Sequence, residues 1–154
     1  MRTTAILFLL LVPACIFSQA ILTKYEQTQA RETPNYPEII NWWTIMDKTF
    51  PSIKMLTMGP TDAGFPLHLV IVSSDRDFDM ASLRKKNKRI ILVNNGIHPG
   101  EPDGIDASML LVRDIVTNKK TLPANVVLAI IPVYNIGGCL NRSSWYRVDQ
   151  NGPA

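Results

Sequence analysis

One histidine and one glutamate, three residues apart, are the side chains in this sequence whose types and spacing point most directly to chemistry. His98 and Glu101 lie in the stretch 94–104, which is rich in glycine, proline and asparagine. Zinc accepts an imidazole nitrogen and a carboxylate oxygen, both at about 2.0–2.2 Å. Catalytic zinc typically keeps three protein ligands and one water, and two histidines with one glutamate form such a set. A His-x-x-Glu pair held in a shaped loop therefore indicates part of a zinc site.

The spacing alone is a weak signal, because such pairs also arise by chance. In the alternative interpretation, His98 is an ordinary loop histidine and Glu101 is an acid favoured by the positive end of a following helix. The place of the pair in the chain favours the metal. The loop follows an apolar run and leads into a helix, and α/β proteins bind ligands beyond the carboxyl ends of their strands.

The elements around this loop are predicted to form a strand-helix-strand unit. The apolar run 89–95 predicts a strand buried on both faces, and 126–131 predicts a second one. Asp103 is the expected cap of a helix over 104–118. Two strands joined by one helix over about forty residues are expected to be parallel.

A helix and a hairpin are predicted before this unit. Asn35 and Glu38 have the spacing of a capping box, and Pro51 ends the helix. Its apolar face has helical spacing and consists of Ile39, Trp42, Trp43, Met46 and Phe50. Segments 53–58 and 66–73 predict the two strands of a hairpin with a longer loop, and 75–87 predicts a charged loop. The expected fold is α/β, with a mixed, mostly parallel sheet flanked by helices.

The first twenty residues have the features of an export signal. Arg2 precedes the apolar run 5–12, and the small residues needed for cleavage occur at 18–20. We therefore expect a secreted or periplasmic protein with no stable membrane association after cleavage. Residues 21–33 are polar and without a clear period, which predicts an N-terminal arm.

Charge and cysteine content exclude several classes of protein. The chain has 16 basic and 13 acidic residues, a net charge of +3, whereas a dedicated nucleic-acid binder has a strong basic face. No aromatic residue interleaves with the basic stretch 84–89, so it offers no stacking surface for bases. Cys139 is the one cysteine outside the predicted signal, which excludes an internal disulfide and a thiolate zinc site.

Several motifs together resemble those of the M14 zinc metallocarboxypeptidases. Segment 95–104 resembles the first zinc-ligand motif of that family. Segment 131–138 is similar to its Pro-x-x-Asn-x-x-Gly stretch, and 147–153 resembles the stretch with an active-site arginine. The resemblance covers about residues 34–153.

The resemblance implies a secreted zinc carboxypeptidase that hydrolyses C-terminal peptide bonds of peptides or proteins with a zinc-activated water. His98 and Glu101 match two ligands of a single Zn²⁺ ion. Arg147 matches the catalytic arginine that polarises the scissile carbonyl and stabilises the developing oxyanion. His68, the other histidine, lies inside a predicted strand and is not proposed as a third ligand.

The family's second histidine ligand, its general base and its carboxylate-binding residues belong downstream of this segment. Residues 34–154 are therefore expected to be the N-terminal part of the catalytic domain, inactive and poorly folded alone, with 126–131 as an apolar edge strand. Two other functions stay open. One is a zinc amidohydrolase of the same fold that acts on N-acyl amino acids or cell-wall peptides. The other is a non-catalytic secreted binding domain.

Overall fold

The computed structural model describes residues 21–98 and 100–142. The predicted export signal and Arg147 both lie outside the described residues. Within the described ranges, no helix is long and apolar enough to cross a membrane.

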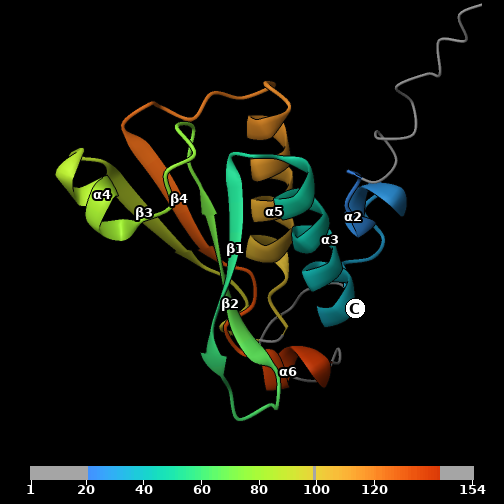
Figure 1. Cartoon of the computed structure of the whole chain (residues 1–154). Coiled ribbons are helices and arrows are strands. Elements are labelled where there is room, and N and C mark those ends of the chain that lie inside the picture. The colour runs from blue at the N-terminus through green and yellow to red at the C-terminus, as the bar shows by residue number, and fades with distance from the viewer. Residues whose placement is uncertain (1–20, 99, 143–154) are drawn as a thin grey trace, which may run out of the picture.

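A four-stranded mixed sheet forms the centre of the molecule (Figure 1). Its strands are β1 (Ile53–Pro60), β2 (Pro66–Val72), β3 (Arg89–Asn94) and β4 (Val126–Ile131), in the spatial order β1-β2-β4-β3. The hairpin β1–β2 and the pair β2–β4 are antiparallel, whereas β3 and β4 are parallel. The mixed α/β sheet and the parallel strand-helix-strand unit are thus confirmed. One of the three described pairings is parallel, so a parallel majority is not found in this part of the chain.

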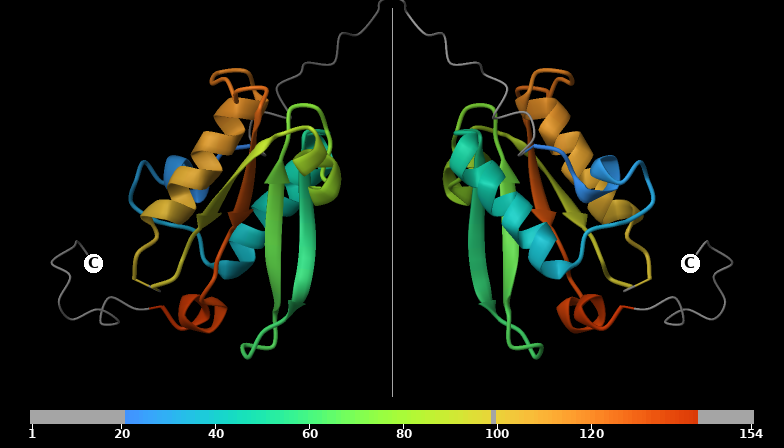
Figure 2. Two further views of the ribbon diagram at one scale, coloured as in Figure 1. Left: turned by 90° about the vertical axis from the view of Figure 1, so that its left-hand side faces the viewer. Right: turned by 90° about the vertical axis from the view of Figure 1, so that its right-hand side faces the viewer.

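Helices pack on both faces of the sheet. The long helices α3 (Tyr36–Thr49) and α5 (Asp103–Val116) pack side by side on one face, where their apolar residues meet those of β2 and β4 (Figures 1 and 2). The short helix α4 (Met80–Lys85) packs on part of the other face, against β2 and β4. Helix α6 (Ile136–Leu140) follows β4, and α2 (Lys24–Gln27) lies outside the two long helices.

The main core lies between the sheet and the pair α3–α5. Large side chains with less than 2% of their surface exposed fill it, including Ile39, Trp43, Met46, Val70 and Met109. These residues come from three elements, so α3, β2 and α5 are held as one unit. The rings of Trp42 and Trp43 meet edge to face, with centroids 4.9 Å apart.

Helix α3 begins and ends where local rules predict. The Asn35 side chain accepts a hydrogen bond from the Glu38 amide at 3.0 Å, and the Glu38 carboxylate accepts one from the Asn35 amide at 2.8 Å. This reciprocal pair is the predicted capping box. The helix ends at Thr49, with Phe50 as its C-cap before Pro51.

The start of α5 differs from the expectation. Pro102 holds the N-cap position and makes no side-chain cap bond, so the expectation that Asp103 caps this helix is wrong. Asp103 is the first helical residue. Its carboxylate is in the first turn, where the positive end of the helix dipole favours an acid.

The predicted charged loop 75–87 contains a helix. Asp79 caps α4 by accepting a hydrogen bond from the Ser82 amide at 2.7 Å. Leu83 is fully buried against Ile71 and Val127. The apolar residues of this segment, Phe78, Met80 and Leu83, do not recur at a clear helical period, which explains why the sequence pattern did not predict this helix.

Strand β3 is one of the two edges of the described sheet, and its apolar side chains are exposed. The predictions that 89–95 is buried on both faces and that 126–131 is the edge are both wrong. The exposed fractions are 37% for Ile90, 49% for Ile91 and 62% for Leu92, whereas β4 lies between β2 and β3. An apolar run marks a strand suited to burial, but it does not say on which side the neighbouring strand lies.

Residues 21–33, predicted as an arm, pack against both long helices. The Trp42 indole donates a hydrogen bond to the Ile21 carbonyl at 3.2 Å, and Arg113 of α5 pairs with Glu26 of α2. Thr23 is fully buried and caps α2. The segment therefore ties α3 to α5 from outside.

Candidate metal centre

His98 and Glu101 lie beyond the carboxyl end of β3, with their side chains turned toward each other. The distance between His98 Nδ1 and Glu101 Oε2 is 2.7 Å, and the two side chains are 48% and 36% exposed. The Glu101 amide also donates a hydrogen bond to the His98 carbonyl at 3.2 Å. The loop thus brings together the two atoms that the sequence singles out.

This donor pair fits zinc. The imidazole nitrogen and the carboxylate oxygen lie next to each other, and solvent reaches both side chains. Tetrahedral coordination with bonds of about 2.0–2.2 Å separates two donor atoms by roughly 3.4 Å. The pair would have to open by less than about 1 Å, which side-chain rotation in an exposed loop can supply. The fit is for two ligands: within 21–98 and 100–142, no group of three or more His, Cys, Asp or Glu residues gathers to hold a metal ion.

The other histidine, His68, lies in the hairpin. It lies within β2, opposite Thr57 of β1, and is partly buried. Its Nδ1 atom is buried without a hydrogen-bond partner among the described residues. Burial lowers the pKa of His68. His68 is thus a strand residue of the hairpin and not part of the loop after β3.

The connection that follows β4 braces the loop. The amides of Tyr134 and Asn135 donate hydrogen bonds to the carbonyls of Asn95 and Gly96, at 2.8 and 3.0 Å. The Asn135 side-chain amide donates to the Ile97 carbonyl at 3.3 Å, while its oxygen caps α6 by accepting from the Gly138 amide at 2.8 Å. Three carbonyls in succession before His98 are therefore fixed by one short segment.

Asn95 anchors the base of the loop to α5. Its side chain is 5% exposed and donates a hydrogen bond to Ser108 Oγ at 2.9 Å. A Cβ atom at Gly104 would lie 2.8 Å from Asn95 Oδ1. The absence of a side chain at Gly104 is what lets Asn95 lie against the first turn of the helix.

Asn95 and Asn135 are positioning residues that the sequence did not single out for this role. The family resemblance included Asn135 within segment 131–138, without a structural task. A signal for both was present, because β3 and β4 are parallel and their carboxyl ends meet at one edge of the sheet. Polar residues directly after both strands are therefore expected to meet.

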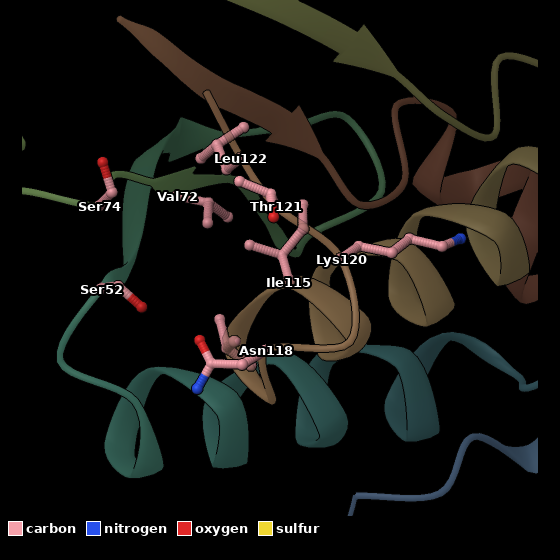
Figure 3. A pocket seen from close by; sticks show the side chains of 9 residues that line it. Ser52, Val72, Ser74, Ile115, Asn118, Lys120, Thr121 and Leu122 are labelled. Carbon is pink, nitrogen blue, oxygen red and sulfur yellow. The ribbon is translucent and has the colours of Figure 1, made fainter. Parts of the chain in front are cut away.

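Two hollows of the described chain lie away from His98 and Glu101. A cavity of about 290 Å³ lies near the amino end of β4 and the end of α5, at the opposite edge of the sheet from His98 (Figure 3). Ser52, Ser74, Asn118 and Thr121 line it with neutral polar groups, over the apolar residues Val72, Ile115 and Leu122. The Lys120 ammonium turns away from it, 3.7 Å from Asp114. A second hollow, of about 250 Å³, lies between the N-terminal segment and α3.

Comparison with known proteins identifies a family. The family model of the zinc carboxypeptidases matches residues 39–150, which includes the loop and the bracing segment. No curated protein matches this chain.

Similar solved structures include three carboxypeptidase-like chains. Bovine thrombin-activatable fibrinolysis inhibitor, in complex with tick carboxypeptidase inhibitor, has a TM-score of 0.58 and 21% identity, over 71% of this chain and 33% of its own. A further structure of thrombin-activatable fibrinolysis inhibitor has a TM-score of 0.63 and 19% identity, over 79% and 29%. Carboxypeptidase A from Helicoverpa armigera has a TM-score of 0.57 and 18% identity, over 79% and 31%. At these identities the likeness shows the fold, and this chain spans about a third of the length of the structures that it matches.

Proposed function

Because the chain belongs to the zinc carboxypeptidase family, we propose that it is part of a secreted enzyme that removes C-terminal residues from peptides or proteins. One observation carries the proposal. The imidazole of His98 and the carboxylate of Glu101 face each other at 2.7 Å, in a loop beyond the end of β3.

In this proposal His98 and Glu101 hold the zinc ion, and the third ligand and the general base come from outside the described residues. When bound, zinc supplies an activated water and a Lewis acid for the scissile carbonyl. Arg147 supplies a fixed positive charge where negative charge develops on the carbonyl oxygen.

The braced loop supports this role. Ligands on a mobile loop would hold a metal weakly, whereas partners beyond the first ligands orient them. Here Asn135 and Asn95 fix the backbone directly before His98 through the hydrogen bonds described above. The peptide substrate is proposed from the family alone.

The test is zinc retention by the full-length protein. His98→Ala and Glu101→Ala should each lose bound zinc and peptidase activity, because a site with three protein ligands cannot spare one. Zinc per chain is measured by mass spectrometry after dialysis, with circular dichroism as the check on folding. His68→Ala is the matched control, since it removes the other histidine and should keep the metal. Stoichiometric zinc in His98→Ala would overturn the proposal.

Arg147→Ala should behave differently from the ligand variants. It removes charge stabilisation and no ligand, so zinc should stay while kcat falls by about 10²–10³. Full activity in this variant would remove Arg147 from the mechanism and leave the ligand assignment standing. Activity on N-acyl amino acids in place of peptides would assign the amidohydrolase alternative.

A further inference from the structure

Asp106 is a buried acid, and one of its two carboxylate oxygens has no hydrogen-bond partner among the described residues. Its side chain lies in the first half of α5 and is 8% exposed. Its Oδ2 atom accepts a hydrogen bond from the Thr33 hydroxyl at 2.7 Å. Its Oδ1 atom is buried and has no hydrogen-bond partner among the described residues. A buried carboxylate oxygen without a hydrogen-bond donor lowers the stability of the folded state, so we expect a donor near this atom.

Arg142, which follows the C-cap residue of α6, has a buried nitrogen that lacks a partner in the same way. Its Nη2 atom donates a hydrogen bond to the Pro34 carbonyl at 3.2 Å. Its Nη1 atom is buried and, in the part of the chain that the structure describes, also lacks a partner. Among the described residues, Asp106 Oδ1 therefore lacks a hydrogen-bond donor, and Arg142 Nη1 lacks an acceptor.

The partners of these two groups are consecutive residues of the chain. Thr33 holds one oxygen of Asp106, and Pro34 holds one nitrogen of Arg142. The charges act on each other as well. Burial raises the pKa of the Asp106 carboxyl, the Thr33 hydroxyl and the positive charge of Arg142 oppose that rise, and the negative charge of Asp103 adds to it.

We propose that one buried water joins Asp106 Oδ1 to Arg142 Nη1, and that this bridged charge pair positions the loop 95–98. A buried water typically makes two to four hydrogen bonds to polar groups that would otherwise be unsatisfied, and two charged groups meet this need here. The pair links α5, which follows the loop 95–98, to the end of α6, whose N-cap residue braces that loop. Asp106 lies on α5, and Arg142 follows α6, whose N-cap Asn135 holds the carbonyls of Gly96 and Ile97.

This role does not depend on zinc, and its test uses no activity. In the wild-type protein, a high-resolution crystal structure should show an ordered water within hydrogen-bond distance of both Asp106 Oδ1 and Arg142 Nη1. A direct contact between the two atoms, or an empty space between them, overturns the bridge. This measurement needs no variant and so holds even where a variant fails to fold.

The positioning role is tested by amide exchange. Asp106→Asn and Arg142→Met should each speed exchange of the Tyr134 and Asn135 amides, which bond the loop, by about tenfold, equivalent to about 1.4 kcal/mol. The double variant should add little to either single one, because both remove the same link. Arg142→Lys keeps the charge and should lie closer to the wild type than Arg142→Met.

Two controls separate positioning from general destabilisation. Asp103→Asn removes an exposed carboxylate from the same part of α5 and should leave both amides within about twofold. Amides of the β1–β2 hairpin should keep their wild-type exchange in all variants. An equal increase in the hairpin, or no increase at Tyr134 and Asn135, overturns the positioning role.

Discussion

At the scale of single residues, the candidate metal loop depends on a glycine. Gly96 has φ of +62°, a conformation that side chains rarely adopt, at the point where the chain leaves β3. A Cβ atom there would also lie 3.2 Å from Val133 Cγ1 and 3.3 Å from Ile105 Cδ1. Backbone strain and crowding therefore act against any substitution at this position.

Gly96→Ala should lower the free energy of unfolding by roughly 1–3 kcal/mol. Denaturant titration followed by circular dichroism measures this change. Gly137→Ala is the matched control, because its Cβ would meet only Ala63 at an ordinary 3.6 Å and it lies in a helix. Alanine is the better helix former, so the control should be neutral or slightly stabilising. Equal losses in both variants would contradict the strain argument.

The sequence predicted the candidate ligands His98 and Glu101, but it did not predict the residues that fix their loop. His98 and Glu101 are three residues apart, so a local pattern is enough to pair them. Asn135 reaches the loop only because β3 and β4 lie side by side, and that contact spans 38 residues. Arg147 stays a prediction, since it lies outside the described residues.

At the scale of elements, two predictions made from local patterns are confirmed, although the Asp103 cap, also a local prediction, is wrong. The capping box of α3 and the hairpin β1–β2 both follow from residues close together in the chain. The predictions for α4 and β3 failed because burial is decided by neighbours from elsewhere. Leu83 of α4 is buried by β2 and β4, whereas β3 has a described neighbour on one side only.

The exposed edge at β3 leads to a prediction about self-association. Leu92 and Ile91 alternate along the strand, so both faces of β3 present apolar surface, and no described strand pairs with its outer edge. Such an edge is a template for pairing with another chain. The 154-residue chain should therefore self-associate at micromolar concentration, as measured by light scattering.

Leu92→Lys should reduce that association, because a charged side chain on an edge strand disfavours edge-to-edge pairing. Leu111→Lys on α5 is the control, since Leu111 is also exposed, at 37%, but lies on a helix with no open backbone edge. A monomeric wild-type chain, or equal effects of both variants, would contradict the prediction.

At the scale of the whole molecule, an ion pair fastens the N-terminal segment to the helical layer. Glu26 of α2 pairs with Arg113 of α5, and these side chains are 27% and 10% exposed. Burial acts to raise the pKa of Glu26, but hydrogen bonds from Arg113 and Thr23 outweigh it and hold that pKa below its ordinary value. The folded state thus prefers the ionised carboxylate.

The pH dependence follows from that direction. A depressed carboxyl pKa stabilises the fold above the unfolded value, about 4.3 for glutamate, and this stability is lost as pH falls through the folded value. Glu26→Gln should cost about 1 kcal/mol at pH 7, after allowance for partial exposure, and much less at pH 3. Thermal unfolding at both pH values measures the difference. Glu32→Gln, which changes an exposed partner of Lys24, is the control and should have little effect. A cost for Glu26→Gln that does not change with pH would contradict the prediction.

The contact between Trp42 and Ile21 links the fluorescence of a tryptophan to the start of the N-terminal segment. Trp42 is 6% exposed, and its indole N–H donates a hydrogen bond to the Ile21 carbonyl. If export cleavage follows Ala20, that carbonyl belongs to the first residue of the mature chain. Trimming by a single amino acid would then open the indole to solvent and shift its fluorescence emission to longer wavelength. With that cleavage, an emission spectrum of the intact protein would report whether its amino terminus is complete.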